Sequence, residues 1–312
     1  MKVALVGGGY WGRNYARILK EYSDKDIELK VVCDRSEAAC NDIENEFGCY
    51  TTTSISEVIY GNVDAVIICT PCKTHYKIAS DCLKSGKHVL VEKPLTYTSK
   101  EAQELCYLAS DKKLVLQVGH TFEYNLLTKY IQQLINQNYL GRIYYMDFVR
   151  VGMSPVRQDV SALWDLATHD ISMALSFIGE QPEYVRAYGN SYLQDGLEDV
   201  VTTHLHFGNN VIANIHCSWL NPVKERKVTI VGSEKMLVFD DIKREIVIYD
   251  KFGTFTPQVE YAQPLTEQID DFFYAIEHGT QPLVTGNIGL SVVKILEKCQ
   301  KSIENDGQKI KT

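Results

Sequence analysis

The chain has 312 residues, of which 45% are hydrophobic and 23% charged, a composition typical of globular proteins and a length that allows two domains with separate cores. Its formal net charge is −8 at pH 7 and it has no basic run, which argues against nucleic acid or an anionic membrane as its partner. The apolar N-terminal stretch is too short for a signal peptide and no stretch approaches a membrane span, so we predict a cytoplasmic protein.

The nine cysteines are scattered through the expected strands and helices, which favours reduced thiols over a disulfide framework. Cys69 and Cys72 form a C-x-x-C pair, but Pro71 interrupts it and no second pair stands nearby to complete a zinc site. We therefore predict neither a redox motif nor a metal site at these thiols.

The first element is a short apolar strand, KVALV, which runs into GGGYWG and then into a helical pattern. The spacing Gly7-x-Gly9-x-x-Gly12 between a strand and a helix is a dinucleotide-binding fingerprint. Its glycines allow a tight turn and a close approach of the backbone to a pyrophosphate. The N–H groups at the start of this helix, where Tyr10 and Trp11 lie, are expected to face the phosphates.

The next strand, IELKVVCD, ends in an acidic residue. Asp34 stands 22 residues after Gly12, where a carboxylate would accept hydrogen bonds from the adenosine ribose and repel a 2′-phosphate. This favours NAD over NADP as the cofactor. Arg35 follows directly and leaves NADP open, because an arginine there can pair with a 2′-phosphate.

Helical and apolar strand patterns then alternate up to residue 121, which predicts a doubly wound parallel sheet covered on both faces, a Rossmann domain over residues 1–121. Ligands bind at the carboxyl ends of such strands. The residues expected there are Gly7, Asp34, Thr70, Pro71, Glu92, Lys93, Pro94, Gly119 and His120. Taken alone, Lys93 is better explained as a solvated lysine at the strand end, paired with Glu92.

The alternation of single strands with single helices ends after residue 121. A helical pattern over 123–137 precedes alternating strands over 141–152, 183–193, 199–220, 226–241 and 244–250, and helical patterns over 267–279 and 289–305 close the chain. Strands joined by hairpins, as at Gly208-Asn209-Asn210, predict a second α/β domain over 122–312 with an open, mainly antiparallel sheet. His204, His206 and His216 share this sheet, but no carboxylate accompanies them, so we predict no metal.

The stretch ALWDLATHD puts Asp165 and His169 four residues apart at the head of a helical pattern, on one face of the helix. An isolated D-x-x-x-H also fits a capped helix with a histidine in the core. The same spacing suits chemistry, because His169 could take a proton near neutral pH while Asp165 orients its ring or holds a hydroxyl group.

Five motifs stand in order: GGGYWG, CTPCKTH, VEKPL, GHTFEYN and DLATHD. Together they resemble the Gfo/Idh/MocA oxidoreductases over nearly the whole chain. The stretch SPVRQDVSALWDLATHDIS, with SWLNPVKERKVTIVGSEKM, resembles the branch of UDP-N-acetylglucosamine 3-dehydrogenase-like proteins. The resemblance implies a homodimer or homotetramer formed through the open sheet. It also implies hydride transfer at a carbon of a sugar, sugar nucleotide or cyclitol.

Carried onto this chain, the resemblance makes Lys93, Asp165 and His169 the catalytic residues. The cofactor site is expected to include Thr70, Pro71, His75, Glu92 and again Lys93. Many members have an Asp three residues after the histidine, where this chain has Ser172. The predicted substrate contacts are Lys93, Tyr124, Asn125, Arg157, Trp164, Asp165 and His169, and Lys224 and Arg226 are further cations that could meet a diphosphate.

The sequence therefore predicts an NAD-dependent dehydrogenase that oxidises a ring hydroxyl, the 3-hydroxyl in this branch, of a sugar or nucleotide-linked sugar. A keto-sugar reductase that uses NAD(P)H and an inositol-type dehydrogenase are alternatives within the same chemistry. A non-catalytic subunit that senses a dinucleotide is an alternative of another class. Such a subunit would need only the glycine turn, so the presence of Lys93, Asp165 and His169 speaks against it.

Overall fold

The structure is a computed structural model that describes residues 1–22, 26–153 and 156–312, so Ser154 and Pro155 of the stretch quoted above lie outside it. The chain forms two compact units, Met1–His120 with Leu265–Val293, and Thr121–Pro264 with Lys294–Thr312. This differs from a single division after residue 121. Helix α8 (Pro264–His278) belongs to the first unit, because Leu265, Ile269 and Phe272 are buried in that unit's hydrophobic core.

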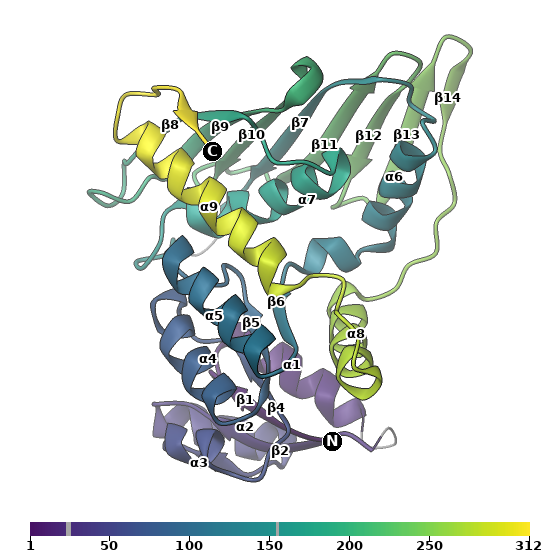
Figure 1. The fold of residues 1–312 in the computed structure, drawn as a ribbon. Coiled ribbons are helices and arrows are strands. Elements are labelled where there is room, and N and C mark those ends of the chain that lie inside the picture. The colour runs from purple at the N-terminus through teal and green to yellow at the C-terminus, as the bar shows by residue number, and fades with distance from the viewer. Residues whose placement is uncertain (23–25, 154–155) are drawn as a thin grey trace. The chain divides into compact units, whose positions relative to one another are not determined.

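In the described residues of the first unit, six parallel strands form one sheet in the order β3-β2-β1-β4-β5-β6. The strands are β1 (Lys2–Val6), β2 (Glu28–Cys33), β3 (Thr51–Thr52), β4 (Ala65–Ile68), β5 (His88–Glu92) and β6 (Leu116–Gly119). The helices between them are α1 (Tyr10–Glu21), α2 (Glu37–Phe47), α3 (Ile55–Ile59), α4 (His75–Lys84) and α5 (Ser99–Asp111) (Figure 1). The predicted Rossmann sheet is confirmed.

The strand order reverses between β1 and β4, and ligands of such sheets bind at this switch point, at the carboxyl ends of the strands. The central strands are buried on both faces: every residue of β4 is inaccessible to solvent, which explains its continuous apolar sequence AVII. The polar residues that follow these strands are therefore held on a rigid, buried frame.

In the described residues of the second unit, nine strands form a sheet in the order β14-β13-β12-β11-β7-β10-β9-β8-β15. They are β7 (Ile143–Val151), β8 (Tyr184–Asn190), β9 (Val200–His206), β10 (Ile212–Ser218), β11 (Glu225–Gly232), β12 (Met236–Asp240), β13 (Glu245–Asp250), β14 (Gly253–Phe255) and β15 (Ile310–Lys311). Neighbouring strands are antiparallel except β7 and β10, which are parallel, so the mainly antiparallel sheet is confirmed.

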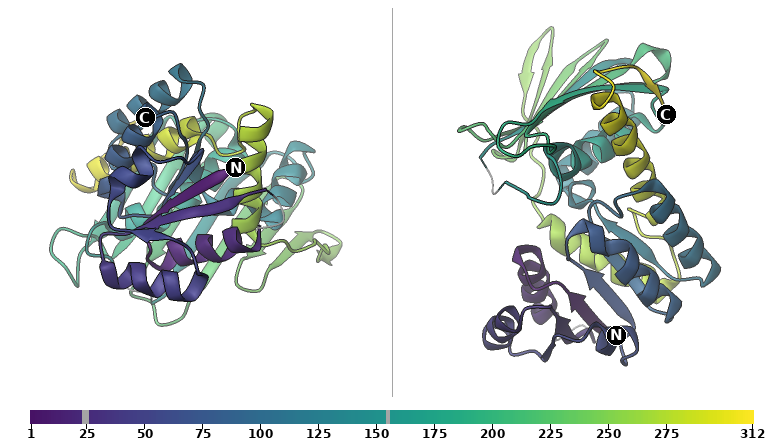
Figure 2. Two further views of the ribbon diagram at one scale, coloured as in Figure 1. Left: turned by 90° about the horizontal axis from the view of Figure 1, so that it is seen from below. Right: turned by 90° about the vertical axis from the view of Figure 1, so that its left-hand side faces the viewer.

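Helices α6 (Leu126–Asn136), α7 (Thr168–Ile178) and the C-terminal part of α9 (Gly286–Ile303) lie along one face of this sheet (Figures 1 and 2). Alternate strand residues on that face, such as Met146, Phe148 and Ile215, are fully buried. Residues between them, such as Tyr145 and His216, are only partly covered. No helix in the described parts of the chain is long and apolar enough to cross a membrane.

Candidate active site

The turn between β1 and α1 is shaped by its glycines. Gly7 has a φ of +100°, and a Cβ atom there would lie 2.8 Å from the carbonyl group of Cys69. A Cβ on Gly12 would come within 1.9 Å of the Gly7 carbonyl oxygen, whereas one on Gly9 would meet open space. No side chain caps α1 at Gly9. The turn thus has the geometry of a pyrophosphate cradle, with the N–H groups of a helix start beside an open approach.

Asp34 anchors this turn to the end of β2. Its Oδ2 accepts a 2.7 Å hydrogen bond from the Gly8 amide, and its Oδ1 accepts one of 2.9 Å from the Ser36 amide. The carboxylate therefore lies beside the glycine turn, as the sequence predicts for a ribose-binding residue. Arg35, the alternative that favours NADP, is exposed directly after it.

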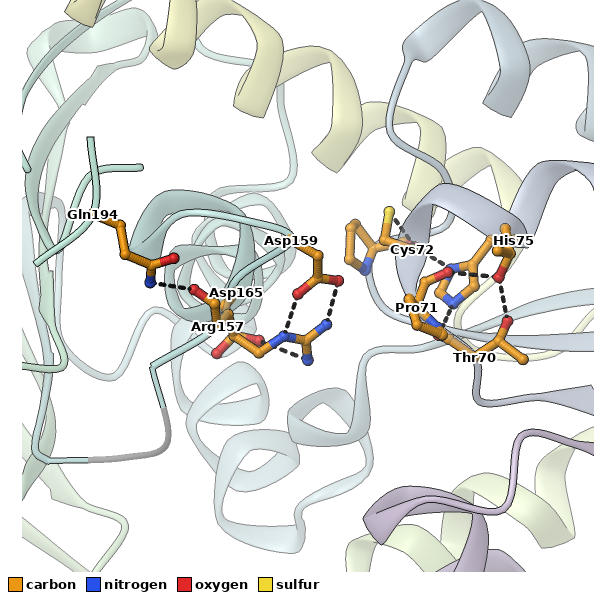
Figure 3. A network of polar contacts seen from close by, with 10 residues as sticks. Thr70, Pro71, Cys72, His75, Arg157, Asp159, Asp165 and Gln194 are labelled. Atoms are coloured by element: carbon orange, nitrogen blue, oxygen red, sulfur yellow. Dashed lines mark hydrogen bonds and ion pairs between the residues drawn. The ribbon is translucent and has the colours of Figure 1, made fainter. Parts of the chain in front are cut away.

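His75 joins the ends of β4 and β5. Its imidazole is 1% exposed, with Nε2 2.7 Å from the Thr70 carbonyl oxygen and Nδ1 2.9 Å from the Pro94 carbonyl oxygen (Figure 3). The hydroxyl group of Thr74 adds a 2.7 Å contact to that of Thr70. His75 therefore orders the two strand-end loops, and its predicted contact with a cofactor stays a prediction.

Neither Cys69 nor Cys72 of the C-x-x-C stretch forms a disulfide bond with a described cysteine. Burial raises the pKa of Cys69 well above the usual range of a thiol, so this side chain stays protonated at neutral pH. Cys72 is buried, with Sγ 3.9 Å from the Pro94 carbonyl oxygen. A protonated thiol is a poor nucleophile, and the absence of a redox motif at this pair stays a prediction.

Lys93 follows Glu92 at the carboxyl end of β5 and is half-buried. The Glu92 carboxyl group turns into the core, where Oε1 accepts a 2.8 Å hydrogen bond from the Tyr15 phenol and Oε2 accepts one of 3.1 Å from the Lys93 amide. The Tyr15 oxygen in turn accepts a 2.6 Å hydrogen bond from Nε2 of Gln268. A Cβ on Gly119 would lie 3.0 Å from this carboxyl group, so glycine leaves the room it needs.

Burial raises the pKa of Glu92, and its bond with Tyr15 opposes that rise. The buried carboxyl group is bonded to α1, and through the Tyr15 phenol to Gln268 on α8, so it supports the loop that carries Lys93. Sequence reasoning placed Glu92 near the cofactor but could not find Tyr15 or Gln268, which lie 77 residues before it and far beyond it in the chain.

Asp165 and His169 lie at the head of α7, as predicted, but the helix there is not a regular α-helix. Leu163–Ala167 forms a π-helical turn, and α7 continues from Thr168. Single π-turns within helices are frequent at functional sites, and their wider winding keeps residues four apart near one side of the helix. The D-x-x-x-H stretch therefore spans a π-helical turn and the first residues of α7, and is not the start of a regular α-helix.

His169 packs beside an aromatic ring and a buried ion pair. The centroids of the Phe122 and His169 rings lie 5.0 Å apart, and the Arg150 guanidinium carbon lies 4.3 Å from the Phe122 ring. Arg150 makes a two-pronged bond with Asp170, of 2.7 Å from Nη2 to Oδ1 and 3.0 Å from Nε to Oδ2. The residue after His169 is thus fixed to the sheet through β7, which sequence reasoning missed.

Ser172, where many members of the family have an aspartate, meets a carboxyl group from another segment. Its hydroxyl group donates a 2.6 Å hydrogen bond to Oε1 of Glu123. Glu123 is 8% exposed, and burial raises its pKa. A carboxyl group is therefore present beside this turn of α7, although it comes from the 3-10 turn η3 (Thr121–Tyr124).

Of the predicted substrate contacts, the structure brings Arg157 and Asp165 together. Arg157 makes two 2.8 Å bonds with Asp159, its Nη1 lies 3.9 Å from Asp165 Oδ1, and its carbonyl oxygen accepts a 2.9 Å bond from Gln194 (Figure 3). Arg157 and Asp159 precede the π-turn and Asp165 lies within it, so a charged group of a ligand could exchange partners with this cluster.

Three other predicted substrate contacts are buried. Trp164 is buried, with Nε1 3.3 Å from Oε1 of Gln300. Tyr124 is 1% exposed, and Asn125 caps α6 by accepting a 2.9 Å bond from the Leu127 amide. Their contacts with a substrate remain predictions.

Two histidines of the sheet are hydrogen-bonded to neighbouring side chains, His204 to Asn214 at 2.7 Å and His216 to Thr202 at 3.1 Å. The ring of His206 stacks on that of Tyr184, with the centroids 4.2 Å apart. Within the described residues, no group of three or more His, Cys, Asp or Glu side chains could hold a metal ion.

Both parts of the chain match known protein families. Residues 1–120 match the Gfo/Idh/MocA oxidoreductase family with its NAD-binding Rossmann fold, and residues 128–238 match the Gfo/Idh/MocA C-terminal domain. A UDP-N-acetylglucosamine 3-dehydrogenase of Acidithiobacillus ferrooxidans is 25% identical over 97% of both chains. Its crystal structure superposes with a TM-score of 0.89 over 98% of both chains.

An inositol 2-dehydrogenase of Rhizobium meliloti is 22% identical over 99% of this chain and 98% of its own. The structure of GenD2 from gentamicin A biosynthesis, in complex with NAD, shares the fold with a TM-score of 0.89, 24% identity and coverage of 100% of this chain and 96% of that one. The family matches cover most of the chain, and with the glycine turn, the EKP loop and the D-x-x-x-H helix they identify it as an oxidoreductase acting on CH–OH groups, a member of the Gfo/Idh/MocA family.

Proposed function

We propose that the protein oxidises a ring hydroxyl group, the 3-hydroxyl, of a nucleotide-linked sugar to a ketone with NAD as the oxidant. The observation that carries this proposal is the half-buried Lys93 at the carboxyl end of β5, on the sheet edge that also carries the glycine turn. A non-catalytic dinucleotide sensor would need the turn and not a lysine supported by the buried Glu92, Tyr15 and Gln268.

The glycine turn fits a dinucleotide, because a Cβ on Gly9 would meet only open space and the start of α1 has no side-chain cap. We assign the pyrophosphate to the N–H groups at Gly9, Tyr10 and Trp11, and the adenosine ribose to Asp34. Bound NAD would supply the hydride acceptor. We favour NAD over NADP because the Asp34 carboxylate would repel a 2′-phosphate.

The chain's own residues must remove the proton of the hydroxyl group. We assign this step to His169, whose imidazole can accept a proton near neutral pH, with Asp165 orienting the ring or a neighbouring hydroxyl group. Lys93 supplies a positive charge that stabilises the oxygen as it loses its proton. Phe122 and the Arg150–Asp170 pair would hold the head of α7 in place during this step.

The relative named UDP-N-acetylglucosamine 3-dehydrogenase supports a nucleotide-linked sugar as substrate. Arg157 and Arg226 are suitable cations, because their ion partners are only partly buried: Arg226 lies 3.4 Å from Asp241. The relatives named inositol dehydrogenase and 1,5-anhydro-D-fructose reductase keep a free cyclitol and a keto-sugar as second candidates.

The test is to incubate the protein with NAD or NADP and a panel of UDP-sugars, free N-acetylglucosamine and myo-inositol, and to follow NADH or NADPH formation by absorbance. NADH formation with a UDP-sugar, and slower formation with the free sugar, is the expected result. Turnover of myo-inositol alone would move the substrate to the cyclitols. NAD binding without turnover of any compound, in either direction, would favour the dinucleotide sensor.

A further inference from the structure

His120 follows β6 at the carboxyl edge of the first unit's sheet. Its side chain is 1% exposed, and neither Nδ1 nor Nε2 has a hydrogen-bond partner among the residues that the structure describes. Buried polar side chains are nearly always bonded, because an unsatisfied group loses its bonds with water and gains none in exchange. A phenylalanine would fill the same space without that cost, so the imidazole points to a bonding partner outside the chain.

The strand register places His120 beside Lys93. Glu92 on β5 pairs with Gly119 on β6, and Lys93 and His120 each follow by one residue. The two side chains therefore leave neighbouring parallel strands at the same level of the ligand-binding edge. Burial first, and then the positive charge of Lys93, lower the pKa of His120 to about 3.

His120 is consequently a neutral imidazole at any pH at which the enzyme works, with one nitrogen that donates and one that accepts. Such a group is a poor base, so it would not compete with His169 for the proton of the substrate. It is a suitable donor to an oxygen atom that gains negative charge, a use of neutral histidine known from other active sites.

We propose that His120 is a catalytic residue: its N–H group and the Lys93 ammonium group form a pair of donors to the substrate oxygen that becomes the ketone. This assignment rests on the proposed function above. No bond to carbon is made or broken by His120. It donates a hydrogen bond to the oxygen as the proton passes to the base, and keeps its own proton throughout.

The test uses His120→Phe, whose ring takes the place of the imidazole without a donor, together with His120→Asn and His120→Gln. The two amides place an N–H group near the positions of Nδ1 and Nε2, so one of them should restore part of the activity. For His120→Phe we expect kcat to fall about 10²- to 10³-fold, the loss typical of removing one donor to a developing oxyanion, with the Kd of NAD unchanged. The pH values at which kcat/KM rises and falls should be the same as in the parent, because His120 does not titrate in that range.

His88→Phe is the matched control, because His88 is a half-buried histidine at the opposite end of β5, where its Nδ1 accepts a 3.0 Å bond from the Val115 amide. It should keep the parent kcat. A His120→Phe variant with the kcat of the parent would overturn the assignment. A variant in which only the affinity for NAD falls would also overturn it, because that result would place His120 against the cofactor. A parent protein that turns over no sugar contradicts the proposed function, whereas an active parent equalled by His120→Phe contradicts this inference alone.

Discussion

The phenol of Tyr15 donates a 2.8 Å hydrogen bond to Oε1 of Glu92, and this bond joins α1 to the carboxyl group at the end of β5. Tyr15→Phe would leave both Glu92 and the Nε2 group of Gln268 short of a buried partner. We expect the free energy of unfolding to fall by about 1–3 kcal/mol, measured by urea unfolding. Tyr76→Phe is the control: it removes an exposed bond to Glu104 and should change stability by less than about 0.5 kcal/mol.

The Tyr15→Phe loss should depend on pH. The pKa of Glu92 is raised in the folded protein, so its ionised form destabilises the fold as the pH rises from the unfolded pKa towards the folded one. The bond with Tyr15 lowers that pKa and thus stabilises the ionised form. The variant should therefore lose more stability at about pH 8 than at about pH 5. A loss that is equal at both values would show that Glu92 does not ionise across this range.

Asp34 is predicted to select the cofactor. The parent should bind NAD at least about tenfold more tightly than NADP, because a carboxylate near a 2′-phosphate repels it. Asp34→Ala should reduce the ratio of the NAD affinity to the NADP affinity. Asp34→Asn should also reduce this ratio, while its side-chain oxygen still accepts the bond from the Gly8 amide. Titrations of both cofactors by calorimetry give the ratio. Equal affinities in the parent would refute the role of Asp34 and shift weight to Arg35.

The ion pair of Arg150 with Asp170 should matter far more for stability than that of Arg157 with Asp159. Both have two-pronged geometry, but the side chains of the first are 7% and 2% exposed and those of the second 40% and 27%. Asp170→Asn leaves a buried guanidinium group without its charge partner, and we expect a loss of about 3–5 kcal/mol. Asp159→Asn should cost no more than about 1 kcal/mol. Similar losses in the two variants would contradict this reading of burial.

The face of the second sheet that α6, α7 and α9 leave uncovered is predicted to bind a second copy of the chain. One row across it, set by the strand register, consists of Tyr184, His206, Ile212, Tyr145, Val231, Met236 and Tyr249. Apolar and aromatic surface of this kind usually meets a partner. Sedimentation should show a dimer or tetramer at micromolar concentration. Tyr145→Arg should weaken it, whereas Tyr107→Arg on α5 should not; a parent monomer would refute the prediction.

Much of the first unit follows from local patterns. Continuous apolar strands, the glycine turn and the regular alternation with helices suffice to predict β1 to β6 in a parallel sheet, because each of these signals lies within a few neighbouring residues. The strand order of the second sheet is harder to predict from the sequence. Strand β7 lies between β10 and β11 and runs parallel to β10, a pairing that joins residues about seventy positions apart and leaves no mark in either strand.

The candidate active site is likewise only partly predictable from the sequence. The motifs predict Lys93, Asp165 and His169, but the groups that hold them come from distant segments: Tyr15 and Gln268 at Glu92, Phe122 beside His169, and Arg150 at Asp170. Such partners are chosen by tertiary packing rather than by spacing in the sequence. Likewise, the sequence places His120 at a strand end, and only its burial without a partner marks it as a candidate.

Lys93 and His169 are proposed to act together on one hydroxyl group. The kinetics of Lys93→Ala, His169→Ala and the double variant test this pairing. Each single change should lower kcat about 10²- to 10⁴-fold while the Kd of NAD stays near that of the parent, because the pyrophosphate is assigned to the glycine turn. The double variant should lose less than the product of the two single losses, since either change interrupts the same proton path. A His169→Ala variant with near-parent turnover would contradict the claim and return the D-x-x-x-H stretch to a capped helix with a histidine in its core.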